Sequence, residues 1–406
     1  YYALAEIYEE IGEYEKALDM VNKALEFADE EREYEYILLK GWIMKLLGRT
    51  DEAKMLLESL LKNKEHLDKV NLGTLYNIMG TLTMHVGQSE SAFKYFDEAL
   101  KIRKEIQDIK GVGAVYINRA LLYDTLGKFE EALEEYRKAQ QAFEEAGYKA
   151  GAITLHIDLG VLFLGTRKVI EAMDEFKRAY KIAAEMGQKK GMLLALYNIS
   201  SCLRYIERWK EAEEFIRRAL EIAGKTGDIE GKLLAMNSLS AIYQYGYSDL
   251  SASEGYFNEA LNLLEKTEDQ NVLATVYARG AALYHEKGDY HLALRYAETA
   301  VEIIERVNYD FYKIPTYFIL ARILLKLGNL KSSFKYLKKA KRVAREIGKS
   351  DGLEYREWLA EYLKDMGKKK GAVKVLKSLR EDYLSRGLKI FAELTQKEID
   401  KIQQDQ

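Results

Sequence analysis

Apolar residues recur along this chain at spacings of three and four, with charged and polar residues between them. The stretch EEALEEYRKAQQAF (130–143) is typical, because its apolar residues fall on one face of a helix. The chain has one proline in 406 residues, and such a shortage favours helices joined by Gly and Asn turns over sheets. The pattern therefore predicts an all-α fold.

A helix–turn–helix pattern returns about every 40 residues. The segment TLGKFEEAL (125–133) is close to EIGEYEKAL (10–18) and to EKGDYHLAL (286–294). Each copy can be anchored on the small residue that follows its turn: Ala17, Ala53, Ala92, Ala132, Ala172, Ala212, Ser253, Ala293, Ser333 and Ala372. Successive anchors are 36, 39, 40, 40, 40, 41, 40, 40 and 39 residues apart. This period predicts a solenoid, because each unit buries its apolar stripe only by stacking on its neighbours.

Two further positions are shared by the copies. Twelve residues before the anchor every copy has Gly, Ala or Ser, which lets two helices cross closely. Five residues before the anchor most copies have a glycine: Gly12, Gly48, Gly87, Gly127, Gly288, Gly328 and Gly367. A left-handed residue there ends one helix and turns the chain into the next. Each unit is therefore predicted to be an antiparallel helix pair.

Three turns depart from this pattern. Arg167 and Glu207 replace the turn glycine in repeats five and six. The segment YQYGYSDLS (243–251) adds a residue and three tyrosines to the turn of repeat seven. Two interpretations of this segment stay open. Either it is a loop variation with Tyr243 in the core, or its tyrosines form an exposed aromatic platform at the edge of a groove.

This order of small, aromatic, Gly and Ala positions resembles the tetratricopeptide repeat family to about residue 380. The 40-residue period, longer than the common period of about 34, is similar to that of LGN-type polarity adaptors and of sensor domains in some bacterial and archaeal regulators. The resemblance implies a right-handed superhelical solenoid of about ten antiparallel helix pairs, a single domain over residues 1–380. A C-terminal capping helix region is expected at 381–406. The first helices would line a concave, partner-binding face.

Residues that carry catalysis or bind metals form no recognisable pattern. No two of the five histidines have the helical spacing of four that zinc sites use, and the lone Cys202 can form neither a cysteine cluster nor an internal disulfide. The sequence contains neither GxxxxGK[ST] nor GxSxG. Phosphatase relatives among peptide-sensing repeat proteins carry their activity on a separate N-terminal bundle, which nothing here matches. We therefore predict no enzyme, no metal and no cofactor.

Partner-binding residues are expected at polar positions that repeat in the first helices. Asn118, Asp158 and Asn198 are spaced by 40 residues, and Asn77 and Asn237 lie one position earlier in their repeats. Asn suits the backbone of an extended peptide because it offers two donors and an acceptor. The resemblance to LGN-like adaptors and kinesin light chains implies such an Asn ladder. The alternative is that these residues only bridge adjacent helices. Further candidates beside them are Arg204, Tyr205, Tyr245, Arg279, His285 and Arg322.

One binding mode of the family is not expected. Its chaperone-tail binders use a Lys fifteen residues before the anchor and an Asn eleven residues before it. The first series contains no Lys in this sequence, and the second contains no Asn. We therefore predict no carboxylate clamp of that kind.

Charge is distributed unevenly, although the net charge is only −3. Residues 1–60 hold 15 acids and 7 bases, whereas residues 326–380 hold 17 bases and 6 acids. The basic end is either a solvated outer face or a site for nucleic acid or an acidic protein. We expect no binding of nucleic acid.

The sequence also indicates where the protein works. It has no run of 18 apolar residues and no signal-peptide pattern, so we expect no membrane association. One cysteine fits the reducing cytoplasm, and abundant Lys and Glu hint at a thermophile. Because residue 1 is a tyrosine inside the first predicted helix, we expect the sequence to be a fragment.

The predicted function is a scaffold that binds a protein or an extended peptide in its concave groove. One alternative is the ligand-sensing arm of a larger signalling or transcription regulator. The other is a nucleic-acid-associated protein that uses the basic C-terminal end.

Overall fold

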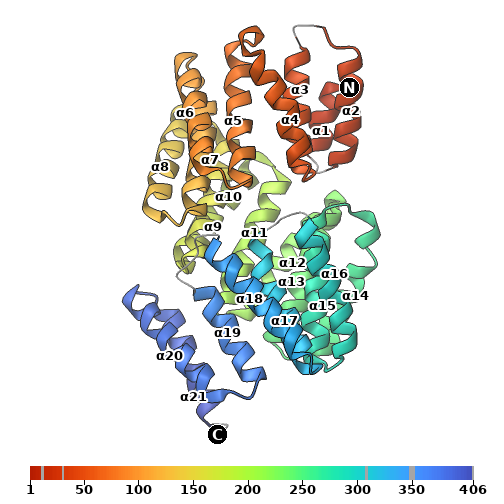
Figure 1. Cartoon of the computed structure of the whole chain (residues 1–406), viewed down its shortest axis with the longest axis vertical. Helices are drawn as coiled ribbons and strands as arrows, with labels where there is room; N and C mark the ends of the chain where they lie inside the picture. The colour runs from red at the N-terminus through yellow and green to blue at the C-terminus, as the bar shows by residue number, and fades with distance from the viewer. Residues whose placement is uncertain (11–12, 30–31, 307–309, 347–352, 405–406) are drawn as a thin grey trace. The chain divides into compact units, whose positions relative to one another are not determined.

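Figure 1 shows the computed structural model of the chain, which describes residues 1–10, 13–29, 32–306, 310–346 and 353–404. Every regular element within these residues is a helix. Ten successive pairs each have a first helix followed by a second, and α21 (Lys389–Gln404) comes after the last pair. The prediction of an all-α solenoid of about ten helix pairs is confirmed.

The helices have the following bounds. The first helices of the pairs are α1 (Tyr2–Glu10), α3 (Glu33–Leu46), α5 (Lys69–His85), α7 (Ile109–Thr125), α9 (Lys149–Gly165), α11 (Lys189–Tyr205), α13 (Ile229–Tyr245), α15 (Gln270–Glu286), α17 (Asp310–Lys326) and α19 (Leu353–Asp365). The second helices are α2 (Tyr14–Glu26), α4 (Thr50–Lys62), α6 (Ser89–Glu105), α8 (Phe129–Glu145), α10 (Val169–Met186), α12 (Trp209–Thr226), α14 (Leu250–Leu261), α16 (Tyr290–Arg306), α18 (Leu330–Glu346) and α20 (Lys369–Ser385). Two short 3₁₀ turns follow α4 and α14, at Lys64–His66 and Leu264–Lys266.

The small residues of the repeat explain how closely the helices of a pair lie. All ten anchors have a relative solvent exposure of 0%. An added Cβ on Gly80 would lie 2.4 Å from a ring carbon of Phe96. The same change at Gly160 would leave 2.5 Å to the ring of Phe176. Both gaps are too short for a real contact, so even Ala at these positions would force the pair apart.

From the second pair onward, the turns between first and second helices pass through a left-handed residue. Gly127 has φ 69°, and the next residue, Lys128, donates its N–H to the carbonyl of Tyr123 at 2.9 Å. Arg167 and Glu207 occupy the same place with φ 63° and 58°. A side chain in this conformation costs roughly 1–2 kcal/mol, so these two turns, like that of the seventh pair at Ser248 (φ 54°), are strained where the glycine turns are not.

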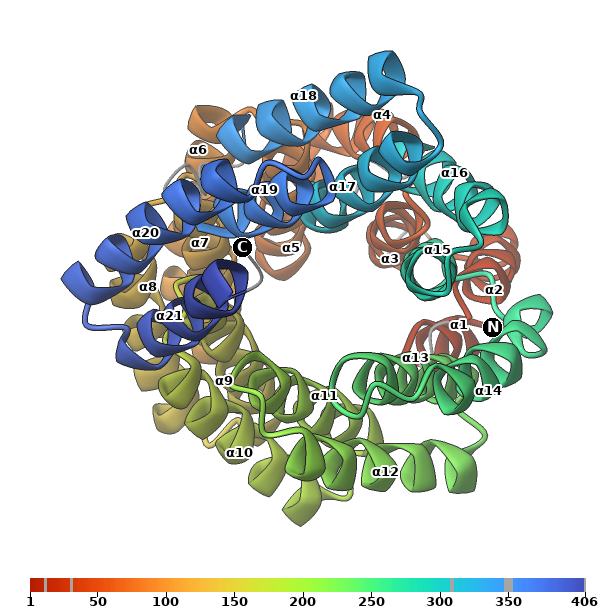
Figure 2. The same cartoon turned by 90° about the horizontal axis from the view of Figure 1, so that it is seen from below.

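The chain divides into two compact units. The first holds residues 1–124 and 128–155, and the second holds residues 125–127 and 156–406. Within the second unit, Figure 2 shows α11, α13, α15 and α17 on the inner side of a curve and α12, α14, α16 and α18 on its outer side. The first helices of this unit therefore face inward.

Arg167 is the reason for one strained turn. Its side chain is only 6% exposed and forms an ion pair with Glu357 of α19, 190 residues further along the chain. Glu357 also accepts a hydrogen bond from the Tyr383 hydroxyl of α20. The guanidinium carbon lies 4.9 Å from the ring centre of Tyr205 and 5.8 Å from that of Phe391. The turn of the fifth pair therefore holds the tenth pair and α21.

Apolar residues support the same contact. One buried cluster contains Val169 of α10 together with Leu353 of α19 and Phe391 of α21. The second unit is thus closed by packing as well as by charge.

We expect Arg167→Gly to destabilise the second unit even though glycine relieves the strained turn. Removing one partner of a buried ion pair costs about 3–5 kcal/mol, and the relief returns about 1–2 kcal/mol, so a net loss of roughly 1–4 kcal/mol is expected. Hydrogen exchange should show reduced protection of α19 and α21.

Glu207→Gly is the matched control, because Glu207 has the same turn geometry with an exposed side chain. It should leave the protection of α19 and α21 unchanged. Equal behaviour of the two variants would contradict a closing role for Arg167.

Candidate functional site

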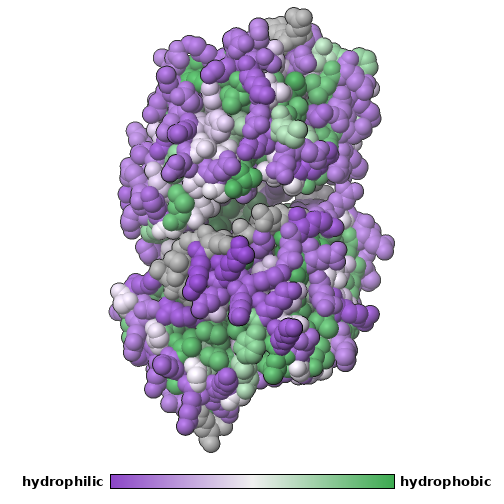
Figure 3. Space-filling model, viewed as in Figure 1, coloured by the Kyte–Doolittle hydropathy of each residue, from purple (hydrophilic) through white to green (hydrophobic). Residues whose placement is uncertain are grey.

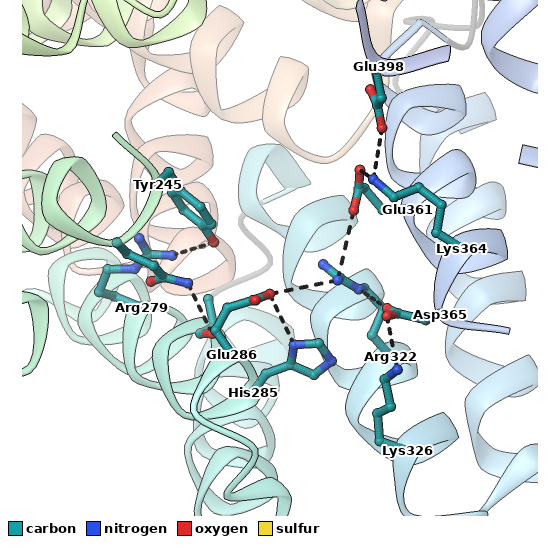
Figure 4. Close-up of polar contacts among 12 residues, drawn as sticks. Tyr245, Arg279, His285, Glu286, Arg322, Lys326, Glu361, Lys364, Asp365 and Glu398 are labelled. Carbon is teal, nitrogen blue, oxygen red and sulfur yellow. Dashed lines mark hydrogen bonds and ion pairs between the residues drawn. The ribbon is translucent and has the colours of Figure 1, made fainter. Parts of the chain in front are cut away.

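A network of charged side chains runs across the inner helices of the second unit (Figure 4). Arg322 of α17, with a side chain 12% exposed, forms an ion pair with Asp365 of α19. Lys326 lies one turn further along α17, and its Nζ is 3.3 Å from Asp365 Oδ1. The guanidinium Nη2 of Arg322 is also 3.9 Å from Glu361 and 4.0 Å from Glu286. Three first helices are therefore linked through one guanidinium.

The network continues from α19 to α21. Lys364 Nζ donates to Glu361 Oε1 at 2.7 Å and to Glu398 Oε1 at 2.9 Å. Burial raises the pKa of Glu398, although Lys364 opposes that rise. Alternating acids and bases thus join four helices, α15, α17, α19 and α21.

The acids at the centre of this network are held in their charged form. Burial alone would raise the pKa of Asp365, but Arg322 and Lys326 keep it below its usual value. The neighbouring His285 lowers the pKa of Glu286, and Arg322 adds to the effect. The inner face therefore presents fixed charges at neutral pH.

The other end of the site joins α13 to α15. Arg279 donates Nη2–H to the Tyr245 hydroxyl at 3.1 Å, and its guanidinium carbon lies 5.1 Å from the ring centre of Tyr245. Gln244, only 5% exposed, donates Nε2–H to the carbonyl of Ala282 at 3.3 Å. Within the described part of the chain, Gln244 Oε1 and Arg279 Nη1 are buried with no hydrogen-bond partner.

His285 lies between the two ends of the site. It is 6% exposed, and its Nδ1 is 3.4 Å from Glu286 Oε1. Its ring meets that of Tyr290 edge to face at 5.7 Å. Neither ring nitrogen makes a well-aligned hydrogen bond to a described residue.

The Asn series does not form one ladder of side-chain contacts. In the first unit Asn118 donates Nδ2–H to Asn77 Oδ1 at 2.9 Å, which joins α5 to α7. In the second unit Asn198 donates instead to Leu194 O of its own helix at 2.9 Å. The Oδ1 of Asn237 is buried without a hydrogen-bond partner among the described residues. Burial raises the pKa of Asp158 to about 7.

Two of the remaining candidates lie at the end of α11. Arg204 is half-buried, and Tyr205 is 42% exposed with its ring against the Arg167 guanidinium. Of the eleven candidate residues, the structure brings Asn77 into contact with Asn118 and Tyr245 into contact with Arg279. It connects Arg322 to the same face of α15 through Glu286.

The tyrosines of the 243–251 segment separate into two groups. Tyr243 and Tyr247 donate their hydroxyls to Glu213 of α12 at 3.0 and 2.7 Å. Tyr245, 51% exposed, contacts Arg279 on the inner side. Neither open interpretation fits all three, because only Tyr245 belongs to the inner face.

Sequence reasoning missed Gln244, Glu286, Lys326, Glu361 and Asp365. A usable signal was present, because the last residues of four consecutive first helices follow the repeat: Tyr205, Tyr245, Glu286 and Lys326. All four are polar or aromatic, although core packing does not require such side chains at the last residue of a first helix.

Part of the basic end lies on the outer helix α18. Exposed cations run along α18 at spacings of four and three, at Lys331, Lys335, Lys338, Arg342 and Arg345, with Lys341 beside them. Figure 3 shows the strongly hydrophilic surface over this helix.

The described residues offer neither a metal-binding cluster nor a membrane-spanning helix. No group of three or more His, Cys, Asp or Glu side chains in the described part of the chain is placed to hold a metal ion. Each described helix is too short or too polar to span a bilayer.

Comparison with known proteins agrees with the helical architecture. The chain resembles a Rap protein solved in complex with competence and sporulation factor, with 15% identity, a TM-score of 0.53 and coverage of 92% of this chain and 98% of that one. It resembles aspartyl phosphate phosphatase F from Bacillus subtilis with 16% identity, a TM-score of 0.55 and coverage of 85% and 93%. It also resembles the apo form of the quorum sensor NprR from B. thuringiensis, with 15% identity, a TM-score of 0.54 and coverage of 83% of this chain and 98% of that one. At these identities the likeness shows a shared fold.

Family models place the sequence more directly, whereas no curated protein matches it. One tetratricopeptide repeat model matches residues 71–145, 191–266 and 272–346. Two further tetratricopeptide repeat models match residues 1–30 and 35–63. These matches cover more than half of the chain and follow the helix pairs described above. The chain belongs to the tetratricopeptide repeat family.

Proposed function

We propose that the protein binds an extended peptide, or a flexible segment of a partner protein, along the inner helices of the second unit. The observation that carries this proposal is a group of buried polar atoms on α13 and α15 without partners among the described residues. It includes Asn237 Oδ1, Gln244 Oε1 and Arg279 Nη1, together with both ring nitrogens of His285. Native proteins leave few such atoms unsatisfied, since each costs about 1–3 kcal/mol. A bound segment would supply the missing partners.

An extended peptide suits these atoms for a chemical reason. Its backbone presents one N–H donor and one carbonyl acceptor at nearly every residue. The oxygens of Asn237 and Gln244 require donors, whereas Arg279 requires an acceptor. Each bond made in this way contributes about 0.5–1.5 kcal/mol, and bonds to a charged group contribute about 1.5–3 kcal/mol.

The solved structures of similar fold support a binding role. One is a Rap protein in complex with a factor, and another is a quorum sensor. The second supports the alternative that this array is the ligand-sensing arm of a larger regulator. The two functions share the inner face and differ in what the rest of the protein would do.

We expect the combined variant Asn198→Ala, Arg204→Ala and Tyr245→Ala to weaken peptide binding by roughly 1–3 kcal/mol per well-buried contact. Calorimetry on peptides recovered from a random linear library measures this loss. Lys338→Ala with Lys341→Ala on outer α18 is the control and should bind as the unchanged protein does. A library that yields no binders, or a variant that binds normally, refutes the proposal.

The two interpretations of the Asn series differ in their effect on stability. Asn118→Ala should lower the free energy of unfolding by about 1 kcal/mol, because it breaks the bond to Asn77 that joins two helices. Asn198→Ala should change stability by under about 0.5 kcal/mol, because its bond lies within one helix. Thermal unfolding of the two variants tests this. A large loss for Asn198→Ala would make that residue structural as well.

We expect no binding of short duplex DNA at about 50 mM salt, where counterion release makes electrostatic binding strongest. The reason is that the cations of α18 form a solvated face on a chain whose net charge is −3. Fluorescence anisotropy provides the measurement. Binding that weakens steeply with salt, and is lost in Lys338→Ala with Lys341→Ala, would establish the nucleic-acid function instead.

A further inference from the structure

Arg279 is a half-buried arginine of the second unit with no acid beside it, unlike Arg322 and Arg167. Arg322 pairs with Asp365, and Arg167 pairs with Glu357. No carboxylate of the described residues lies within ion-pair distance of Arg279. Its Nη1 is nevertheless buried and makes no hydrogen bond within the described part of the chain.

Arg217 of outer α12 makes the difference clearer. It also donates Nη2–H to a tyrosine hydroxyl, that of Tyr243, at 3.1 Å. There, however, Glu213 lies 2.6 Å from the same guanidinium nitrogen and neutralises it. Arg279 has the tyrosine but lacks the acid. A guanidinium with a buried nitrogen and no counter-charge loses part of its hydration without compensation, so this arrangement indicates that the acid comes from elsewhere.

The surroundings of Arg279 limit what that acid can be. Tyr245 holds Nη2 at 3.1 Å and leaves Nη1 available. Gln244, next to Tyr245 in the chain, is joined to Ala282, one turn along α15 from Arg279. Its Oε1 lacks a donor, so the same helix turns offer one positive donor and one neutral acceptor.

We propose that Arg279, with Gln244, forms a subsite for a carboxylate group of the bound peptide, which rests on the proposed function. The carboxylate accepts from Arg279 Nη1, and a neighbouring backbone N–H of the peptide donates to Gln244 Oε1. The chaperone-tail clamp uses other positions, whose Lys and Asn are absent here.

Two sources can supply this chemistry, the C-terminus of a peptide or an Asp or Glu side chain. Three matched pools of random linear peptides distinguish them. The first has free C-termini and no Asp or Glu, the second is amidated and contains Asp and Glu, and the third is amidated and contains neither. Affinity selection with mass spectrometry measures which pool the whole chain retains.

We expect the chain to retain the first or the second pool and to discriminate against the third. Arg279→Gln should bind the retained peptides about tenfold to a hundredfold more weakly, since it removes one charge-assisted bond. Arg217→Gln is the matched control and should retain full affinity. Thermal unfolding checks that both variants fold, and Arg279→Lys, which keeps the charge, should preserve the preference if Arg279→Gln does not fold.

The outcomes separate the two proposals. Retention of the first pool identifies a terminal carboxylate, and retention of the second identifies an acidic side chain. Equal retention of all three pools, or a preference that survives Arg279→Gln, overturns the carboxylate subsite while the peptide-binding function stands. No retention from any pool overturns the peptide-binding function and the subsite with it.

Discussion

Each helix pair depends on one crossing where only a very small side chain fits. The anchor residues have no exposed surface, and glycines such as Gly80 lie against an aromatic ring with no room for a methyl group. Close packing of this kind fixes the distance between helices to a fraction of an ångström. Because the same crossing recurs about every 40 residues, neighbouring first helices are held in a constant register. Residues such as Gln244 and Arg279 meet their neighbours on the next helix for this reason.

The inner face shows how a repeat protein keeps charges away from bulk water. A charge taken from water is tolerated when an opposite charge and hydrogen bonds replace its solvation. Arg322 meets this condition with Asp365, and Lys364 meets it with Glu361 and Glu398. Such pairs bring little net stability, but they fix the positions of the charges. A face of this kind favours a partner by matching its charges more than by burying apolar area.

The sequence predicted the fold because the fold repeats. The spacing of the anchors was enough to place Tyr245, Arg279 and Arg322 on first helices, and the structure brings them to the inner side of the second unit. It did not predict the Arg167–Glu357 contact, which joins residues 190 positions apart. The repeat period predicts whether a residue lies on the inner or the outer face of its own helix pair. Which distant pairs meet depends on a small rotation per repeat, and that rotation is set by side-chain packing rather than by spacing.

One row of acidic residues on α19 takes part both in the contact that closes the second unit and in the charge network of its inner face. Glu357, Glu361 and Asp365 follow one another at intervals of four, so like charges stack along one face of the helix. Alone, each such pair would destabilise the helix by about 0.2–0.5 kcal/mol.

Each acid of this row has a cation beside it, and for Glu357 and Asp365 that cation comes from another part of the unit. Glu357 pairs with Arg167 from the turn of the fifth pair, and Asp365 pairs with Arg322 of α17. Lys364 bridges Glu361 to α21. The ion pairs therefore offset the repulsion between the acids of α19. The three acids span only about 12 Å along the helix. Because one short, rigid helix carries all three pairs, a shift of α19 at the Arg167 end must also move the charges that Asp365 and Glu361 present to the inner face.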